Sequence, residues 1–218
     1  MSIPKRRQAP SGADSDARPG HYFDRQPAVE SRPRTVHLHL GELELEMKAD
    51  RGVFGSRAVD LGTLTLLREA SPPPLAGEIL DLGCGYGPIA ITLARTAPGA
   101  RVWAVDVNER ALELTRENAS ALGAANVTAV QPDQVPAGLE FDAIYSNPPV
   151  RVGKAALHEL LLRWLPRLRP GATALLVVQR NLGADSLATW LAAQGFGVRR
   201  LKSKKGYRIL EVTSGPQP

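Results

Sequence analysis

The spacing of apolar residues predicts a β-hairpin near the N-terminus and a helix after it. Residues 35–47 read TVHLHLGELELEM, in which apolar and polar positions alternate on both sides of Gly41-Glu42. A period of two that is interrupted by a glycine-containing pair is typical of two strands joined by a tight turn. After a loop, residues 52–70 change to helical spacing. The apolar positions expected on one face of this helix are Val59, Leu61, Leu64 and Leu67.

Beyond Gly77, buried strands and helices alternate along the chain. The expected strands are GEILDLG, RVWAVDV, NVTAV, FDAIYSN and GATALLVVQR, followed by a hairpin, VRRLKSKKGYRILEVT, that turns at Lys205-Gly206. The expected helices are GPIAITLARTAPG, NERALELTRENASALGA, AALHELLLRWLPRLRPG, which ends near Pro170-Gly171, and ADSLATWLAAQGF. Such alternation is typical of a parallel sheet with right-handed crossovers. We therefore expect an α/β fold with a Rossmann-like doubly wound seven-stranded sheet, mostly parallel with the last strand antiparallel.

The chain divides into three segments by composition. Residues 1–20 carry Pro, Gly, Ser, Ala and mixed charges without periodicity, which is typical of a disordered tail. Residues 21–76 form a small N-terminal β-hairpin and helix extension. Residues 77–218 form the α/β domain.

Composition and charge limit the classes of partner. The net charge of +5 and the pI near 9.7 permit a nucleic-acid partner without requiring one. Cys84 is the single cysteine, and with four histidines it cannot build a Cys/His zinc cluster, so we expect no metal site and no internal disulfide. The N-terminus has no apolar signal region, and no apolar run reaches the roughly 20 residues of a membrane span. We expect a cytoplasmic protein with no membrane partner.

A glycine-rich loop, DLGCGYG, follows the first strand of the α/β domain and opens a helix. Glycines let a ligand approach the backbone, and a helix N-terminus offers unpaired N–H groups. The pattern G-x-G-x-G before Pro88 differs from the dinucleotide fingerprint G-x-G-x-x-G, which argues against NAD. Asp106, at the end of the second strand, is placed to accept both ribose hydroxyls, and Asp133, after the third, to receive an adenine amine. Acids at strand ends are also often simple caps, and that alternative stays open.

The loop and the acid after it resemble those of class I S-adenosylmethionine-dependent methyltransferases over residues 77–213. The resemblance implies that S-adenosylmethionine is the cofactor. It also implies that the glycine loop packs against the methionine portion, that Asp81 supports the loop and the ammonium end, and that Asp106 and Asp133 bind ribose and adenine. The glycines to which this role is carried are Gly83, Gly85 and Gly87.

The sequence Asn147-Pro148-Pro149 ends the fourth strand, which should lie beside the first. An exocyclic amine is a poor nucleophile because its lone pair is delocalised into the ring. Two acceptors, the side-chain carbonyl of Asn147 and the backbone carbonyl of Pro148, would take its two N–H groups and aim the lone pair. The rigid proline pair would hold both acceptors in place. An Asn-Pro dipeptide is also a common turn, which is the structural alternative.

The same triplet is similar to the N/D-P-P-Y/F signature of amino-group methyltransferases, although Val150 stands where that signature has an aromatic residue. The wider run NPPVRVGK looks like the NPPIRAGK form of the small-domain, RsmC-like family, and the resemblance then covers roughly residues 21–213. It implies methyl transfer to the N2 amine of a guanine in small-subunit ribosomal RNA. By the same resemblance Phe54 closes over the cofactor. Val150, Arg151 and Lys154 are expected to face the substrate, the two cations meeting RNA phosphates.

Two other readings stay open. The acceptor is a glutamine in a protein or a small-molecule amine, or the chain is a non-catalytic assembly factor that binds the cofactor and RNA. The oligomeric state is left as monomer or homodimer. A basic cluster on the final hairpin either contacts RNA or forms a solvated face; its members are Arg199, Arg200, Lys202, Lys204, Lys205 and Arg208.

Overall fold

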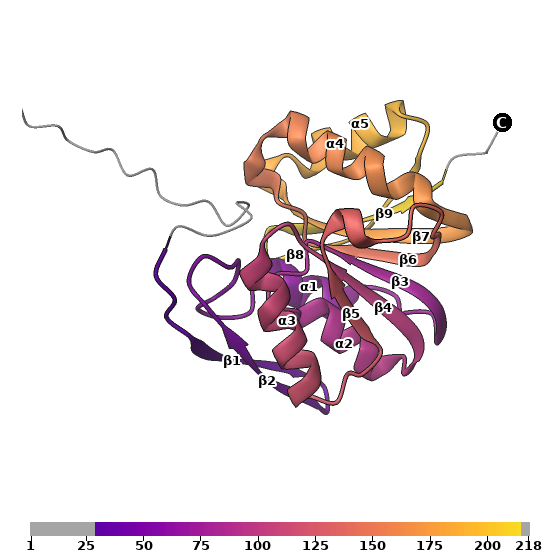
Figure 1. Ribbon diagram of the computed structural model, residues 1–218. Coiled ribbons are helices and arrows are strands. Elements are labelled where there is room, and N and C mark those ends of the chain that lie inside the picture. Colours follow the sequence, from indigo (N-terminus) through magenta and orange to yellow (C-terminus); the bar gives the residue numbers. More distant parts are fainter. Residues whose placement is uncertain (1–28, 215–218) are drawn as a thin grey trace, which may run out of the picture.

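The computed structural model describes residues 29–214 of the chain (Figure 1). The tail predicted for residues 1–20 lies outside the described residues. Within the described range, a seven-stranded sheet and a separate two-stranded sheet carry all the strands.

The large sheet has the strand order β5-β4-β3-β6-β7-β9-β8. Its strands are β3 (Ala76–Leu82), β4 (Gly99–Val105), β5 (Val127–Val130), β6 (Phe141–Ser146), β7 (Leu168–Gln179), β8 (Gly197–Lys204) and β9 (Tyr207–Thr213). The strands from β5 to β7 pair in parallel, whereas β9 runs antiparallel to both β7 and β8. This order confirms the predicted Rossmann-like doubly wound sheet. The strands β3, β4 and β5 extend the sheet toward one edge, and after β5 the chain returns to place β6 on the other side of β3.

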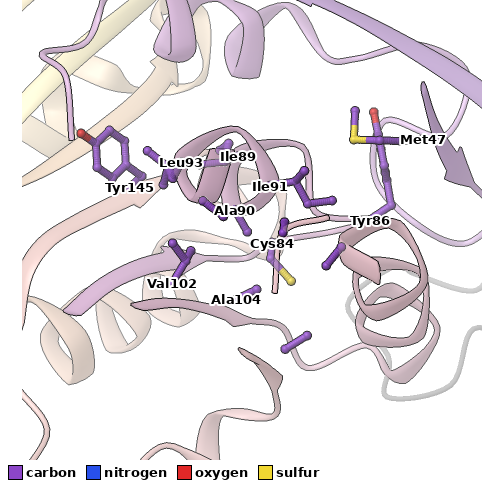
Figure 2. Close-up of a cluster of buried hydrophobic side chains, with 14 of the residues drawn as sticks. Met47, Cys84, Tyr86, Ile89, Ala90, Ile91, Leu93, Val102, Ala104 and Tyr145 are labelled. Carbon is purple, nitrogen blue, oxygen red and sulfur yellow. The ribbon is translucent and has the colours of Figure 1, made fainter. Parts of the chain in front are cut away.

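Five α-helices cover the two faces of this sheet. They are α1 (Leu61–Glu69), α2 (Pro88–Thr96), α3 (Glu109–Ala121), α4 (Lys154–Trp164) and α5 (Ala184–Ala193). Figure 1 shows α4 and α5 on one face and α1, α2 and α3 on the other. Neighbouring residues on a strand point to opposite faces, so Ile79 joins the core under α2 and Leu80 the core under α4 and α5. Figure 2 shows part of the first core, which gathers Ile89, Ala90 and Ile91 of α2 with Val102 of β4.

The N-terminal hairpin packs into that same first core. It consists of β1 (Arg34–Leu40) and β2 (Leu43–Ala49), joined at Gly41, whose φ of 61° suits glycine. Val36 and Met47 on its inner face are buried. Asn118 on α3 binds both backbone groups of Lys48: its Oδ1 accepts from the N–H at 2.7 Å and its Nδ2 donates to the carbonyl at 2.8 Å. The side chain of Asn118 therefore bonds β2 to α3 through the same backbone groups that a neighbouring strand would use.

Two details of the sequence prediction were wrong. The helix after residue 154 ends at Trp164, not near Pro170, because Pro166 has no N–H to continue the helical hydrogen bonds. Pro170 and Gly171 lie instead in a bulged part of β7. Leu61 on α1 is 49% exposed, since the buried side of that helix is formed by small residues and one leucine: Gly62, Thr63, Thr65 and Leu66.

Among the described residues, no helix combines the length and the apolar character that crossing a membrane requires.

Candidate active site

A cleft opens at the carboxyl ends of β3, β4, β6 and β7, where ligands bind in open α/β sheets. It contains about 1090 Å³ of space not filled by protein atoms, its open mouth included. Gly83 and Asp106 line one side, and Asn147 and Pro148 line another. The fold thus brings together the two motifs that the sequence singled out, because β3 and β6 are direct neighbours.

The glycine loop is tied to the end of β4. The N–H groups of Gly83 and Cys84 donate to the carbonyl of Val105 at 2.8 and 3.0 Å. An added Cβ at Gly83 would meet no atom within 4 Å, because that side of the residue faces the open cleft. Gly87 differs, since a Cβ there would lie 3.0 Å from Thr115 Cγ2. Gly83 and Gly85 therefore line the cleft, whereas Gly87 permits close packing of α2 against α3.

Asp106 connects the loop to the second strand end. Its Oδ2 accepts the N–H of Gly85 at 3.0 Å, and its Oδ1 accepts the N–H of Asn108 at 2.9 Å. Burial raises the pKa of this carboxyl above its ordinary value, in opposition to those hydrogen bonds. The side chain lines the cleft at the position from which a ribose is bound in this fold.

Asp81 lies behind the loop and does not line the cleft. Its Oδ2 accepts the N–H of Ala90 at 2.9 Å, and its Oδ1 is buried without a hydrogen-bond partner among the described residues. Burial raises the pKa of Asp81 to about 8, and the nearby charge of Asp106 adds to the rise. The bond to Ala90 ties Asp81 to the first turn of α2, and both the support of the loop and the contact with the ammonium end of the cofactor stay predictions.

Asp133 is turned away from the cleft. It lies in the short helix η1 (Pro132–Gln134), and its carboxylate is 2.8 Å from Nη2 of Arg163, with 71% of the side chain exposed. Pro132, one residue earlier, lines the cleft instead. The adenine contact of Asp133 therefore stays a prediction, because the neighbouring Pro132 lines the cleft and Asp133 does not.

Both amide hydrogens of Asn147 are engaged by α1 and its cap. Nδ2 donates to Asp60 Oδ2 at 2.8 Å and to Thr63 Oγ1 at 3.1 Å. Asp60 is the N-cap of α1, and the same Oδ2 accepts the N–H of Gly62 at 2.8 Å. With its donors occupied, Asn147 has its carbonyl oxygen left as an acceptor at the cleft.

The proline pair forms a tight turn. The carbonyl of Pro148 accepts the N–H of Val150 at 2.8 Å, and Pro149 has φ −74° and ψ 69°, the geometry of an inverse γ-turn. The turn leads into the short helix η2 (Val150–Val152). The Pro148 carbonyl thus already accepts one hydrogen bond, and a second lone pair remains for a ligand.

The expected substrate-facing residues divide between two hollows. Val150 and Arg151 line the cleft, and Lys154 lines a smaller hollow beside it that shares Val150. The side chains of Arg151 and Lys154 form no ion pair or hydrogen bond with any described residue. Both cations are thus available to an anionic ligand at the mouth of the cleft.

Asp60 and Tyr207 are among the cleft-lining residues that sequence reasoning missed. Tyr207 begins β9 and packs so closely on α1 that a Cβ at Gly62 would lie 2.8 Å from its Cε1. Tyr207 thus brings an aromatic ring to the cleft from β9, whereas Val150, at the position where the signature has an aromatic residue, does not. An acid directly before a helix is a readable N-cap signal for Asp60; no local signal marks Tyr207.

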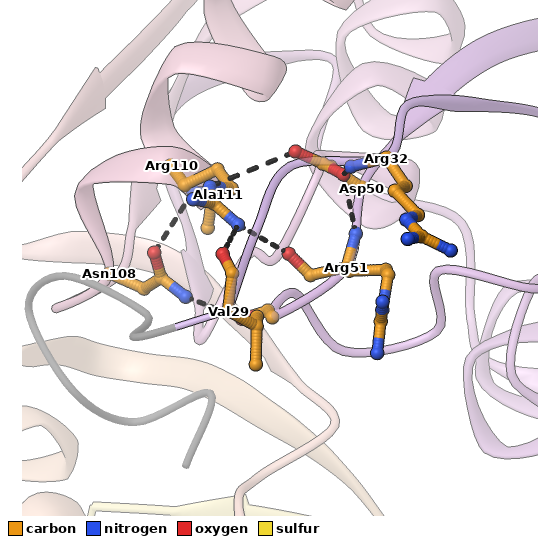
Figure 3. A network of polar contacts seen from close by, with 8 residues as sticks. Val29, Arg32, Asp50, Arg51, Asn108, Arg110 and Ala111 are labelled. Atoms are coloured by element: carbon orange, nitrogen blue, oxygen red, sulfur yellow. Dashed lines mark hydrogen bonds and ion pairs between the residues drawn. The ribbon is translucent and has the colours of Figure 1, made fainter. Parts of the chain in front are cut away.

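The N-terminal extension forms one wall of the cleft through Val53 and Phe54. The loop that carries them is held by α3: Asn108 Nδ2 donates to the carbonyl of Gly52 at 2.9 Å, and Arg110 Nη1 donates to that of Arg51 at 2.7 Å. Figure 3 shows this network, in which Arg110 also faces Asp50. The position of Phe54 is consistent with its expected contact with the cofactor, which remains a prediction.

Comparisons with known proteins agree with this geometry. The profile of the family "Methyltransferase small domain" matches residues 44–211. The chain is 35% identical over 195 residues to the uncharacterized protein YbxB of Bacillus subtilis, with 88% of this chain and 97% of that protein covered. It is 31% identical to ribosomal RNA small subunit methyltransferase C of Yersinia enterocolitica, with 94% of this chain and 59% of that protein covered.

Among solved structures, the fold is similar to T. thermophilus 16S rRNA N2 G1207 methyltransferase (RsmC) in complex with AdoMet and guanosine. The TM-score is 0.72 at 27% identity, with 86% of this chain and 52% of that chain covered. The chain thus spans about half the length of these ribosomal RNA methyltransferases.

The cleft fits the cofactor of the family, because Gly83 leaves open space toward it and Asp106 stands at its edge. The cofactor is S-adenosylmethionine. The chain belongs to the small-domain family of class I S-adenosylmethionine-dependent methyltransferases.

Proposed function

We propose that this protein transfers a methyl group from S-adenosylmethionine to the exocyclic N2 amine of a guanine in small-subunit ribosomal RNA. The observation that carries the proposal is the arrangement of Asn147, whose amide hydrogens are held by Asp60 and Thr63 while its carbonyl oxygen is left to accept. This acceptor stands in the same cleft as the glycine loop. The similarity to methyltransferases named for this RNA supports the choice of substrate.

The chain's own residues would hold the cofactor and orient the amine. Gly83, Gly85 and Asp106 would hold S-adenosylmethionine, which supplies a methyl group activated by its sulfonium. Asn147 Oδ1 and the free lone pair of the Pro148 carbonyl would each accept one N–H of the amine. Because those hydrogens then lie in a fixed plane, the nitrogen lone pair is directed to one side of it.

The fixed dipoles also stabilise the charge that develops on the amine. S-adenosylmethionine would supply the methyl carbon, and the amine nitrogen that accepts it would carry positive charge until it lost a proton to water. Carbonyl oxygens that are already oriented need no reorganisation at that moment. The bond between Asn147 and Asp60 keeps the acceptor oriented even when no substrate is bound.

The charges at the mouth of the cleft support a nucleic-acid substrate. Arg151 lines the cleft, Lys154 lines the hollow beside it, and Arg180 follows Gln179, which also lines the cleft. None of these three side chains forms an ion pair or hydrogen bond within residues 29–214. Lysine and arginine contacts to phosphate position a nucleic acid without reading its sequence. Such a set favours an anionic acceptor over a neutral small amine.

The test is a transfer assay with purified protein and tritiated S-adenosylmethionine. The acceptors are ribosomal RNA and total protein, both from a strain that lacks the gene. We expect label in the RNA alone, recovered as N2-methylguanosine, and a loss of at least about 100-fold with Asn147→Ala, since an orienting acceptor of this kind supplies roughly 3 kcal/mol or more.

Gln194→Ala is the matched control, because this exposed amide at the end of α5 lies outside the cleft lining. It should retain wild-type activity. Label in the protein fraction instead of the RNA would contradict the proposal, as would full activity of Asn147→Ala.

A further inference from the structure

The carboxylate of Asp60 is used on one side only. Its Oδ2 accepts from Gly62 N at 2.8 Å, from Thr63 N at 3.3 Å and from Asn147 Nδ2 at 2.8 Å. No described residue donates a hydrogen bond to Oδ1. Asp60 lines the cleft, half-buried, beside Asn147 and Tyr207. The role of Asp60 as the N-cap of α1 explains the hydrogen bonds to Oδ2. That role does not explain why Oδ1 is left without a donor.

The two unused oxygens belong to one hydrogen-bonded pair of side chains. Asn147 Nδ2 and Asp60 Oδ2 are bonded to one another, so the remaining oxygen of each group lies next to that bond. The pair therefore presents two acceptors to one ligand, one amide oxygen and one carboxylate oxygen. A ligand that fills both must have two donors on adjacent atoms.

Guanine has such an edge. Its N2 amine is bonded to the carbon that also carries N1, and N1 bears a hydrogen. An NH2 group is also present in adenine, in cytosine and in the side-chain amide of glutamine. In each of these the carbon that carries the NH2 group is bonded to an acceptor, where guanine has N1–H. A carboxylate oxygen at that position would repel their lone pairs, and an unpaired charge in a half-buried site is costly.

We propose that Asp60 reads the N1–H of guanine through Oδ1 and thereby selects guanine among amine-bearing acceptors. This inference rests on the proposed guanine-N2 function and adds the residue that determines specificity. Asn147 and Pro148 take the two amine hydrogens, and Asp60 takes the hydrogen of N1. The arrangement also fixes which way round the base enters, because the opposite edge would turn the N3 lone pair toward the carboxylate.

The contact should have a large effect on binding. A hydrogen bond to a charged group is worth roughly 1.5–3 kcal/mol, which corresponds to about 10-fold to 100-fold in affinity. A base without the N1 hydrogen places an acceptor beside the carboxylate of Asp60, and this repulsion adds to the discrimination against that base. The preference for an N1–H ligand is therefore a measurable signature.

Three ribonucleosides separate this role from a structural one. Guanosine has both the amine and N1–H, inosine has N1–H without the amine, and 2-aminopurine riboside has the amine with an acceptor at N1. Binding of each is titrated by calorimetry to the full chain in the presence of S-adenosylhomocysteine. We expect the wild type to bind guanosine and inosine at least about tenfold more tightly than 2-aminopurine riboside.

The variant is Asp60→Asn. Asparagine is as good an N-cap as aspartate, so α1 keeps its cap, and a thermal melt checks the fold. Its amide group presents a donor where Oδ1 stood. We expect guanosine and inosine to lose at least about tenfold in affinity while 2-aminopurine riboside binds at least as well as to the wild type. Glu46→Gln, which removes one exposed charge on β2 away from the cleft, is the matched control and should change nothing.

Each other outcome overturns the inference in a recognisable way. If Asp60→Asn weakens guanosine but not inosine, Asp60 acts only by holding Asn147. If the wild type binds all three ribonucleosides equally, or none of them, Asp60 does not read N1. The proposed function fails separately, when the same wild-type preparation methylates no guanine in ribosomal RNA.

Discussion

The basic residues near the cleft differ from those on the C-terminal hairpin in whether they pair with acidic side chains. On the hairpin formed by β8 and β9, five of the six clustered cations have acidic partners. Arg199 pairs with Glu211, Arg200 and Arg208 pair with Asp185, and Lys202 and Lys204 pair with Glu69. Lys205, at the turn, has no partner among the described residues. Near the cleft, Arg151, Lys154 and Arg180, which follows the cleft-lining Gln179, likewise have no acidic partner within residues 29–214.

The difference shows that a cluster of charge in the sequence does not measure the charge available to a ligand. The hairpin sequence between Arg199 and Arg208 has no acid, yet the fold brings Glu69 from α1 and Asp185 from α5 against it. The cations near the cleft, Arg151, Lys154 and Arg180, form no run in the sequence, and none of them meets an acid in the described part of the chain. We therefore expect the smaller group to dominate RNA binding.

Removal of the mouth charges should have the largest effect. For Arg151→Ala/Lys154→Ala we expect the affinity for a small-subunit ribosomal RNA transcript to fall about tenfold or more near physiological salt. The slope of log affinity against log salt should fall by about 1.5, because two phosphate contacts are lost. Filter binding at several salt concentrations measures both quantities.

The hairpin provides the matched control for that experiment. Lys202→Ala/Lys204→Ala removes the same number of charges, but both lysines already pair with the carboxylate of Glu69, which offsets part of their charge. We expect less than about a threefold change in affinity and little change in the salt slope. A larger loss with the hairpin variant than with the mouth variant would reverse the comparison.

An intermediate effect should come from Glu69→Gln, which removes the acid and keeps the lysines. Lys202 and Lys204 then become available to phosphate, so RNA affinity should rise by about twofold to threefold at low salt and return to the wild-type value at high salt. The same filter-binding series measures it. Unchanged affinity at every salt concentration would mean that the hairpin lies outside the RNA path even when it is unpaired.

The smallest effect concerns stability in acid. Hydrogen bonds from Lys204 and Lys202 lower the pKa of Glu69 from 4.5 to about 2. Because the folded-state pKa is below the ordinary value, the pairing stabilises the fold above pH 4.5, and this contribution is lost as the pH falls toward about 2. Urea unfolding of the wild type and of Glu69→Gln should therefore differ at pH 6 and converge near pH 2. A constant difference over the whole range would exclude this linkage.

Most of the fold could be predicted because the central strands are covered by helices on both faces. Such strands read as apolar runs, and the glycine loop and Asn147 fall at their carboxyl ends, where the parallel topology brings them together. The end of α4 was missed because apolar residues continue past Trp164 into β7, so the periodicity alone does not reveal where Pro166 stops the helix.

The support of the site could not be read from the sequence. Asp60 and Asn147 are separated by 87 residues, and nothing local to either predicts their bond. Of the apolar positions predicted for the buried face of α1, Leu64 and Leu67 pack against the core and only Leu61 is exposed. The side of α1 that meets Tyr207 needs small residues and contains Gly62, which the apolar pattern does not reveal. Glu69, which pairs with Lys202 and Lys204 of the hairpin, is likewise distant in sequence, so the sequence alone does not reveal that pairing.

The most direct test of the central claim is mass spectrometry of nucleosides from ribosomal RNA, comparing strains with and without the gene. Complementation with the wild type and with Asn147→Ala completes the set. The account predicts that N2-methylguanosine falls on deletion, returns with the wild type and does not return with Asn147→Ala. An unchanged nucleoside profile in the deletion strain would contradict it.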